Sequence, residues 1–415
     1  MTSKEKLQLA LNHKEGPLPL DLGATAVTGM HVNTIRNLRH HFGLEDHPVK
    51  VWEPYQMLGE VEEDLMEAMG IDVIGVVGKK NMFGIENEGW RSMQTFWGQE
   101  VLVPAMFNTS EDEKGNLLIH PEGDRNVPPT AKMPRDSYFF DALNRQQPFD
   151  EADLKVEDNL EEFNVMNEDD LNHFEAESQK AAATGKGVIA TFGGTAFGDI
   201  ALVPAMQLKD PRGIRDVSEW YMSTIMRQDY VHGIFEGQSE IALQNLEMLK
   251  EKVGDQVQAT FICGTDFGTQ DSQFCDVDTF NSLYAPYYKK INDWIHTHTS
   301  WKTFKHSCGA VKPFMKAFIE AGFDIINPVQ INAKDMDPEV LKKEFGRDLV
   351  FWGGGVDTQV VLPFGKPEEV ADQVKHACDV FGKDGGFVFN TVHNIQANVP
   401  VENIVAMLDA LRPYR

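Results

Sequence analysis

KTFKHSCGAVKPFMKAFIEAGFDIINPV, residues 302–329, shows the pattern that decides the fold. Two short β-rich runs, KTFKH and FDIINPV, flank a longer segment of helical period. Strands that alternate with helices are typical of parallel sheets, because two parallel strands need a crossover connection. This unit predicts a strand, a helix and a second, parallel strand.

The same rhythm recurs along the chain. Beside these two strands, the pattern predicts strands at PLPLDL (17–22), DVIGVV (72–77), GVIATF (187–192), VQATFI (257–262), LVFWGG (349–354) and GFVFNTV (386–392). Eight such units favour a closed (β/α)8 TIM barrel over an open sheet. We expect one barrel domain over residues 1–415.

The spacing of the predicted strands breaks once, between the second and the third. Residues 80–180 form a long insertion there, which includes a predicted hairpin at EDEKGNLLIH (111–120) and an acidic stretch. A connection of this length is usually functional when it is ordered. We expect a lid or a surface on which a partner docks.

Composition excludes several classes of protein. The formal net charge of −26 argues against nucleic acid as a partner, because the phosphates would be repelled. There is no run of 18 apolar residues, and MTSKEKLQLALNHKEG resembles a mature N-terminus. We expect a cytoplasmic protein without a membrane span, and the four cysteines are too few for a disulfide scaffold.

Histidine and cysteine side chains stand at the ends of two predicted strands. His306 and Cys308 are two residues apart, so in an extended segment both side chains project to the same side. His393 follows the eighth predicted strand, and strand ends converge on one face of a barrel. A catalytic zinc typically has three His, Cys or carboxylate ligands and one open position. These three residues therefore predict a zinc site, whereas the pair alone would fit a satisfied histidine beside a buried cysteine.

Two other cysteines are better explained by the core. Cys378 follows Val370 and Val374 at helical spacing, on the apolar face of a helix that is predicted to begin at Lys366-Pro367. Cys263 ends a predicted strand and points toward the barrel mouth, although a buried thiol is the more frequent explanation there.

Three segments resemble a known family. HSCGAVKPFMKAFIEAGFDIINPVQ (306–330), FWGGGVDTQVVLPFGKPEEV (351–370) and GGFVFNTVHNIQANVPVENIVAMLDALR (385–412) are similar to the uroporphyrinogen decarboxylase superfamily, specifically its corrinoid-dependent methyltransferase branch. The likeness extends from about Gly187 to Arg415, and it implies a (β/α)8 barrel. In those methyltransferases an H-x-C pair and a later cysteine bind zinc. The pair maps to His306 and Cys308, and His393 occupies the position of the later cysteine.

A histidine, His393, in place of the later cysteine favours one direction of methyl transfer. Two imidazoles and one thiolate leave the zinc unit with a net positive charge, whereas a second thiolate would neutralise it. A more electrophilic ion suits polarisation of an ether oxygen. We expect demethylation of a small methoxylated substrate, with the methyl group passed to the cobalt of a corrinoid on a partner protein.

Phenyl methyl ethers are the leading substrate class, since a phenolate leaves more easily than an alkoxide. Candidate contacts to the aromatic ring are Phe192, Phe197, Phe267 and Trp352, each of which fits the barrel core equally well. Further substrate contacts are expected at Asp357, Gln359 and Asn394, unless these side chains only satisfy loop backbone. Asp199 and Asp266 follow strands and are candidate catalytic groups, as zinc ligand, proton donor or orienter of a histidine, or else helix caps.

Three other functions compete. A methyltransferase that moves methyl from a corrinoid to a thiol such as coenzyme M would favour sulfur as the third ligand, where this chain has His393. A porphyrinogen decarboxylase would need arginines to hold a polycarboxylate, and LDLGATAVTG (20–29) has none. A non-enzymatic scaffold would not need stoichiometric zinc. Whether the chain forms a homodimer is left open.

Overall fold

The computed structural model describes residues 1–415, and a parallel sheet of seven strands lies at its centre. The order of the strands across this sheet is β15-β14-β13-β12-β11-β10-β3. Their bounds are β3 (Val73–Val77), β10 (Gly187–Thr191), β11 (Ala259–Cys263), β12 (Lys302–His306), β13 (Ile325–Asn327), β14 (Val350–Trp352) and β15 (Phe387–Val388). Seven of the eight predicted strands are therefore confirmed, in the predicted sequential and parallel arrangement.

The remaining predicted strand, PLPLDL, is not a strand. Only Leu20 forms an isolated parallel bridge, to Phe389 beyond β15, while its carbonyl accepts the N–H of Asp72 at 2.8 Å, just before β3. Pro17 and Pro19 have no N–H to donate to a ladder, which limits pairing here. Leu20 thus joins the two edges of the curled sheet, and the fold is α/β and barrel-like.

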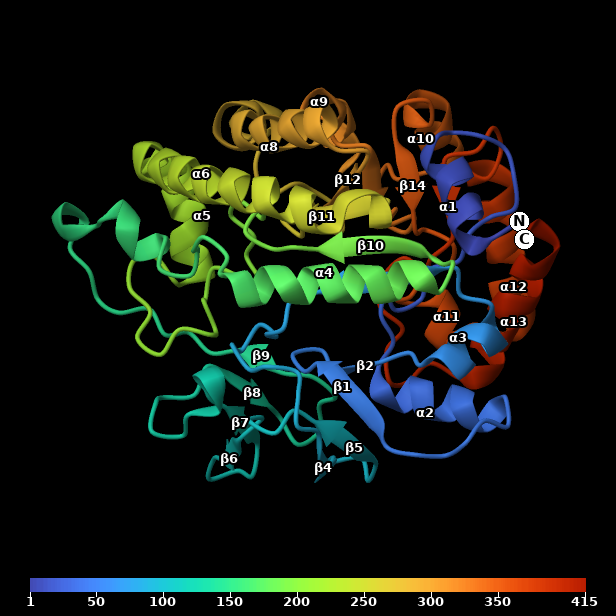
Figure 1. Ribbon diagram of the computed structural model, residues 1–415, viewed down its shortest axis with the longest axis horizontal. Helices are drawn as coiled ribbons and strands as arrows, with labels where there is room; N and C mark the ends of the chain where they lie inside the picture. Colours follow the sequence, from blue (N-terminus) through green and yellow to red (C-terminus); the bar gives the residue numbers. More distant parts are fainter.

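Helices cover the outer face of this sheet (Figure 1). The longer helices of the molecule are α2 (Val32–His41), α4 (Glu168–Ala183), α5 (Val217–Met226), α6 (Gln228–Val253), α8 (Ala285–His298), α12 (Pro367–Phe381) and α13 (Val401–Leu411). The shorter ones are α1 (Ser3–Leu11), α3 (Glu63–Met69), α7 (Val277–Thr279), α9 (Met315–Glu320), α10 (Pro338–Phe345) and α11 (Val361–Phe364). The predicted helix start at Lys366-Pro367 is confirmed, and Val370, Val374 and Cys378 are all buried on α12.

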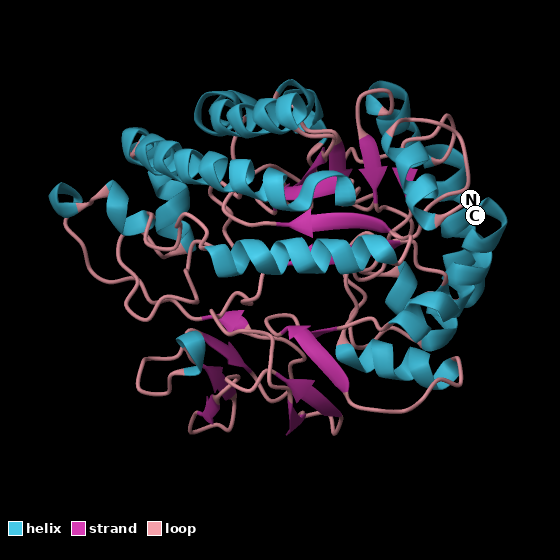
Figure 2. Cartoon of the chain, in the orientation of Figure 1, coloured by secondary structure: helices cyan, strands magenta, loops and turns pink.

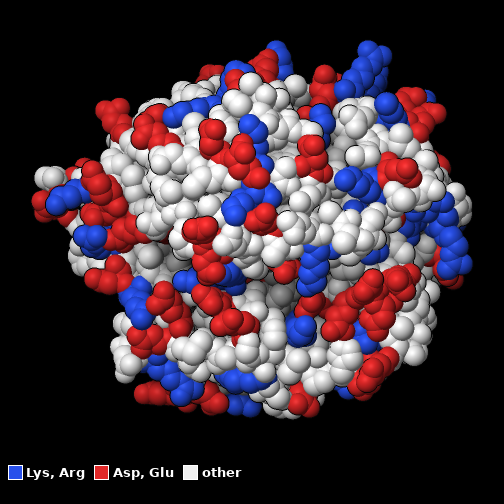
Figure 3. Space-filling model, in the orientation of Figure 1, with Lys and Arg blue, Asp and Glu red and all other residues white.

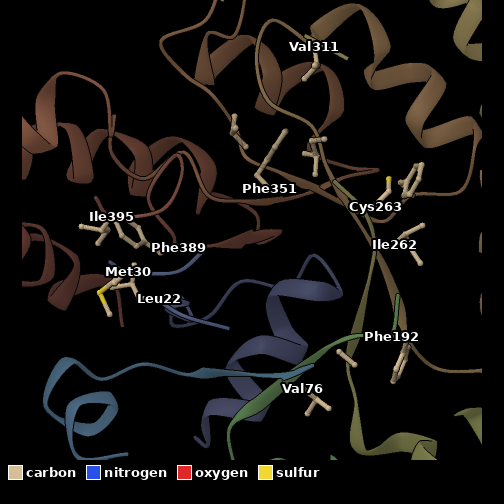
Figure 4. Packing of buried hydrophobic residues seen from close by; sticks show 14 of the residues in the cluster. Leu22, Met30, Val76, Phe192, Ile262, Cys263, Val311, Phe351, Phe389 and Ile395 are labelled. Carbon is tan, nitrogen blue, oxygen red and sulfur yellow. The ribbon is translucent and has the colours of Figure 1, made fainter. Parts of the chain in front are cut away.

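Two cores fill the molecule. The smaller core contains side chains from all seven strands of the parallel sheet, among them Val73, Ile189 and Trp352. Leu7 and Leu11 of α1 also belong to it. This cluster is the interior of the curled sheet. The larger core lies outside it and includes Phe192, Cys263 and Phe351, which Figure 4 shows among their buried neighbours.

A β-rich lobe lies below α4 in the view of Figures 1 and 2, and most of its buried apolar residues are part of the larger core. One sheet has the order β2-β1-β5-β4 and the other β6-β7-β8-β9. The bounds are β1 (Val49–Glu53), β2 (Leu58–Gly59), β4 (Arg91–Gln94), β5 (Glu100–Val103), β6 (Thr109–Glu111), β7 (Leu117–Ile119), β8 (Ala131–Met133) and β9 (Asp141–Ala142). The hairpin predicted at residues 111–120 is confirmed by the antiparallel β6–β7 pair. The long connection after β3 therefore contributes most of this lobe.

Charged side chains of both signs are spread over the surface. Acidic and basic side chains alternate over the face in Figure 3, with acidic groups gathered at several places. No helix has both the length and the apolar character that a bilayer crossing requires.

Candidate metal centre

The three predicted zinc ligands meet at the carboxyl ends of the parallel strands. His306 is the last residue of β12, Cys308 lies two residues further on, and His393 is in the loop after β15. One donor atom from each side chain lies within 4.8 Å of the other two. The two imidazole rings meet edge to face, with centroids 5.6 Å apart. This set of one sulfur and two nitrogen donors is compatible with zinc.

A sharp turn after Cys308 makes this convergence possible. Gly309 has a φ of 88°, in the left-handed region that favours glycine. A Cβ atom at this position would lie 2.4 Å from the carbonyl carbon of Gly268, in the neighbouring loop. Glycine at position 309 therefore lets the chain turn away directly after Cys308.

Asn327 at the end of β13 fixes the orientation of His306. The Nδ1–H of His306 donates to Oδ1 of Asn327 at 2.6 Å, and Nδ2 of Asn327 donates to the carbonyl of Trp352 at 2.7 Å. Because the second bond determines which way the amide faces, Nδ1 of the imidazole carries the proton. The lone pair of Nε2 then faces Sγ of Cys308, 3.3 Å away.

The predicted catalytic carboxylates lie beside this cluster. Asp266 Oδ1 accepts the N–H of Cys308 at 2.6 Å and is 3.9 Å from Nε2 of His306. Burial, together with the charge of Asp266, raises the pKa of Asp199 to about 6. Asp199 also accepts the N–H of Ala201 at 3.0 Å, which is a local capping contact. Asp266 is therefore the one of the two that touches a ligand segment.

Burial controls the protonation of the ligands. It lowers the pKa of His306 to about 4, and together with the neighbouring His306 it lowers that of His393 to about 4. Burial and then Asp266 raise the pKa of the Cys308 thiol well above its usual range. Both imidazoles are thus ready to bind a cation at neutral pH, whereas binding must displace the thiol proton.

The four aromatic residues predicted to hold a substrate ring lie in the hydrophobic core. They are Phe192, Phe197, Phe267 and Trp352, all at most 7% exposed. The ring of Phe267 packs edge to face on Phe280 and Tyr284, and the indole N–H of Trp352 donates to Asp21. Core contacts account for these rings, so their role in substrate binding stays a prediction.

The three polar residues predicted to contact substrate are engaged in loop structure. Asp357 accepts the N–H groups of Gln359 and Val360, and Gln359 in turn accepts a hydrogen bond from Asn332. Asn394 accepts the N–H of Gly29 and donates to the carbonyl of Ala26. These bonds favour the structural interpretation, and substrate contact stays a prediction for all three.

A cavity of about 480 Å³ lies next to the loop that carries His393. Its lining comes from the lobe and from that loop: Tyr55, Gln56, Tyr138, Phe139, Phe140, Asp141, Gln396, Ala397 and Asn398. Gln56 also accepts a hydrogen bond from Asn394, the residue after His393. The lobe therefore contributes exposed aromatic side chains beside the ligand loop.

Two residues of the centre were missed in the sequence. Asn327 stands at the end of a predicted strand, which is the same signal that selected Asp199 and Asp266. Lys305 precedes His306 and is fully buried, although lysine in a strand ordinarily indicates an exposed position.

Similarity to solved structures supports the fold. A methyltransferase from Methanosarcina mazei aligns over 100% of this chain and 99% of its own, with a TM-score of 0.56 and 13% identity. An endo-glycoceramidase II from Rhodococcus sp., solved as a lactosyl-enzyme intermediate, covers 55% of this chain and 60% of its own, with 11% identity. Its TM-score of 0.30 is too low to support any inference. A search of the curated proteins finds no match.

A comparison of the sequence with models of protein families identifies the family of this chain. The model of the family described as uroporphyrinogen decarboxylase (URO-D) matches residues 204–414, half of the chain. This range contains β11 to β15 and all three residues of the metal centre. The chain belongs to the uroporphyrinogen decarboxylase (URO-D) family.

Proposed function

We propose that this protein is a zinc-dependent methyltransferase that demethylates a methoxylated compound, with aromatic methyl ethers as the substrate class. The methyl group passes to the cobalt of a corrinoid carried by a separate protein. The observation that carries this proposal is the convergence of His306, Cys308 and His393 within 4.8 Å. The fold shared with a solved methyltransferase supports it.

The donor set and its surroundings fit a catalytic zinc. Two imidazoles and one thiolate are zinc ligands, and three protein ligands leave a position for substrate. His306 already directs Nε2 toward Sγ of Cys308, so this part of the site is organised in advance. When bound, zinc supplies a Lewis acid for the ether oxygen.

The protein's own residues prepare that chemistry. Asn327 holds His306 in the tautomer that leaves Nε2 free, and Asp266 holds the backbone of Cys308 through its N–H. A single thiolate among the three ligands keeps the site more electron-poor than a site with two. This ligand charge favours ether cleavage over activation of a thiol, which is the second candidate direction of transfer.

Residues 80–180 have the role of a lid in this proposal. Tyr138 and Phe139 come from this segment and line the cavity beside the His393 loop. Both side chains are partly exposed, at 39% and 43%, and so remain available to an aromatic ring or to a docking partner. The cavity thus offers exposed rings, whereas Phe192, Phe197 and Phe267 are buried.

The direct test is methyl transfer itself. The zinc-loaded protein is incubated with a reduced corrinoid protein and a panel of methoxyaromatics, methanol and methylthiols, while the visible spectrum reports methylation of cobalt. We expect methylation with methoxyaromatics, and its loss together with zinc in His306→Ala, Cys308→Ala and His393→Ala. Cys378→Ala removes a buried thiol of α12 and is the matched control, which should keep both.

Two results would contradict the proposal. Full activity in a zinc-free His393→Ala protein would remove the metal from the mechanism. Methylation of cobalt by methylthiols alone, with thiol sulfur bound to zinc in X-ray absorption spectra, would favour the thiol methyltransferase instead.

A further inference from the structure

Lys305 is buried beneath the metal centre. Its side chain is 0% exposed, and its Nζ donates to the carbonyls of Thr265 at 2.6 Å and His306 at 2.8 Å. Three aromatic rings surround the ammonium, those of Phe267, Phe318 and Tyr288, with centroids 4.9, 5.5 and 5.8 Å away. Burying a charge costs free energy unless other groups replace its contacts with water. A buried ammonium in this position therefore needs an explanation.

The position of Lys305 in the sheet suggests a structural role for its ammonium group. The ladder between β11 and β12 ends at the pair Cys263–Lys305. Beyond it, the segments that carry Asp266 and Cys308 are joined by bonds to side chains: the N–H of Phe267 donates to Oγ of Ser307 at 2.9 Å, and that of Cys308 to Asp266 at 2.6 Å. Nζ of Lys305 connects these two segments through its hydrogen bonds, at the point where the ladder between β11 and β12 ends.

The charge of Lys305 acts on the same groups. Burial raises the pKa values of Asp199, Asp266 and Cys308, and the ammonium opposes this rise in all three. The ammonium is therefore a fixed positive charge inside the protein that favours the ionised forms of these three groups.

We propose that Lys305 is the positioning residue of the metal centre: its buried ammonium clamps the carbonyls of Thr265 and His306 and so holds Asp266 and the His306–Cys308 pair in place for the metal. This inference rests on the zinc site of the proposed function. It concerns the affinity for metal and the order of two loops, and both are measurable without methyl transfer.

The experiment compares the full-length protein with Lys305→Met, which has a similar length but no donor and no charge. Zinc affinity is measured by competition with a chelating dye, and the thermal unfolding of the metal-free protein is recorded in parallel. We expect the zinc Kd to rise roughly 10- to 100-fold, as for other residues that orient metal ligands. The melting temperature should change little, because removal of the cost of burying a charge offsets the loss of the two bonds to carbonyls.

Two further variants complete the comparison. Lys302→Met changes the lysine at the other end of β12, which pairs with Asp324, and should keep the zinc Kd within about twofold. Lys305→Gln keeps an N–H donor without the charge, and its zinc Kd should lie between those of Lys305→Met and the unchanged protein. If Lys305→Met does not fold, the zinc Kd of Lys305→Gln is the deciding measurement. A Kd equal to that of the unchanged protein would then overturn the inference.

Other outcomes are equally decisive. A zinc Kd within about twofold of the unchanged protein in Lys305→Met, or a weaker affinity that only accompanies lost stability, would reduce Lys305 to a core residue. Hydrogen exchange of the metal-free protein separates this inference from the proposed function. Roughly tenfold faster exchange at residues 264–268 and 306–309 in Lys305→Met supports the clamp even if the unchanged protein binds no zinc, and unchanged exchange in that case overturns it.

Discussion

The orientation of His306 in the candidate metal centre depends on a neighbour that is not itself one of the three candidate ligands. Burial lowers its pKa to about 4, so the ring is neutral, and the bond to Asn327 decides which nitrogen keeps the proton. Without that bond the ring could rotate or take the other tautomer, and Nε2 would no longer face Cys308.

Asn327→Leu should therefore weaken zinc binding roughly 10- to 100-fold while leaving one zinc per chain at saturation. Chelator competition gives the affinity. Asn292→Leu is the matched control, because Asn292 is also fully buried but bonds to the carbonyl of Ala321, away from the centre. Equal zinc affinity in Asn327→Leu and the unchanged protein would show that Asn327 does not orient the ligand.

Sequence patterns predicted the three residues that meet in the candidate metal centre, but not their surroundings. His306, Cys308 and His393 could be predicted because strand ends converge in any barrel. Phe192 and Trp352 could not be placed, because strands of a parallel barrel are buried on both faces and alternation no longer tells inside from outside. Trp352 lies in the inner core and Phe192 in the outer one.

Among the elements, the strands were the easier prediction. Seven are confirmed, whereas PLPLDL pairs through Leu20 alone. The β-rich lobe was predicted only as an insertion with one hairpin, since short strands with little apolar alternation, such as RSMQ of β4, carry a weak signal.

Helix α2 is attached to the lobe through a histidine. Nδ1 of His31 accepts the N–H of Asn33 at the helix start, and Nε2–H donates to the carbonyl of Tyr138, both at 3.1 Å. Burial lowers the pKa of His31 to about 4 from an ordinary value of 6.5. Protonation would place a hydrogen on Nδ1 and break the cap.

This histidine predicts a loss of stability in acid. The unfolded chain takes up a proton at His31 below about pH 6.5 and the folded chain only near pH 4, so stability falls as the pH falls through that window. Between pH 7 and 5 the loss from His31 is about 2 kcal/mol. Urea unfolding of the metal-free protein should show a smaller loss in His31→Asn, which keeps a capping side chain but does not titrate. Identical pH slopes would exclude this role.

Asp72 joins the ends of the chain across the curled sheet. It is buried and accepts hydrogen bonds from the N–H of Leu20, from Lys6 of α1 and from Arg415 at the C-terminus. Figure 1 shows the two termini side by side. A single carboxylate thus links the segments that close the sheet, which no local pattern in the sequence indicates.

Asp72→Ala should destabilise the protein by about 3 kcal/mol, because it leaves Lys6 and Arg415 without their anionic partner in a mostly buried site. Zinc affinity of the folded protein should not change, since the centre lies at the opposite ends of the strands. Denaturant unfolding measures the first effect. Asp372→Ala, on the exposed side of α12, is the control, and an equal effect of the two substitutions would contradict this role of Asp72.

X-ray absorption at the zinc edge of the purified protein, loaded with one equivalent of zinc, tests the metal centre most directly. We expect one sulfur at about 2.3 Å and two imidazole nitrogens at about 2.0–2.1 Å, with the sulfur lost in Cys308→Ala. A shell without sulfur, or with two or more sulfurs from the protein, would contradict a centre built from His306, Cys308 and His393.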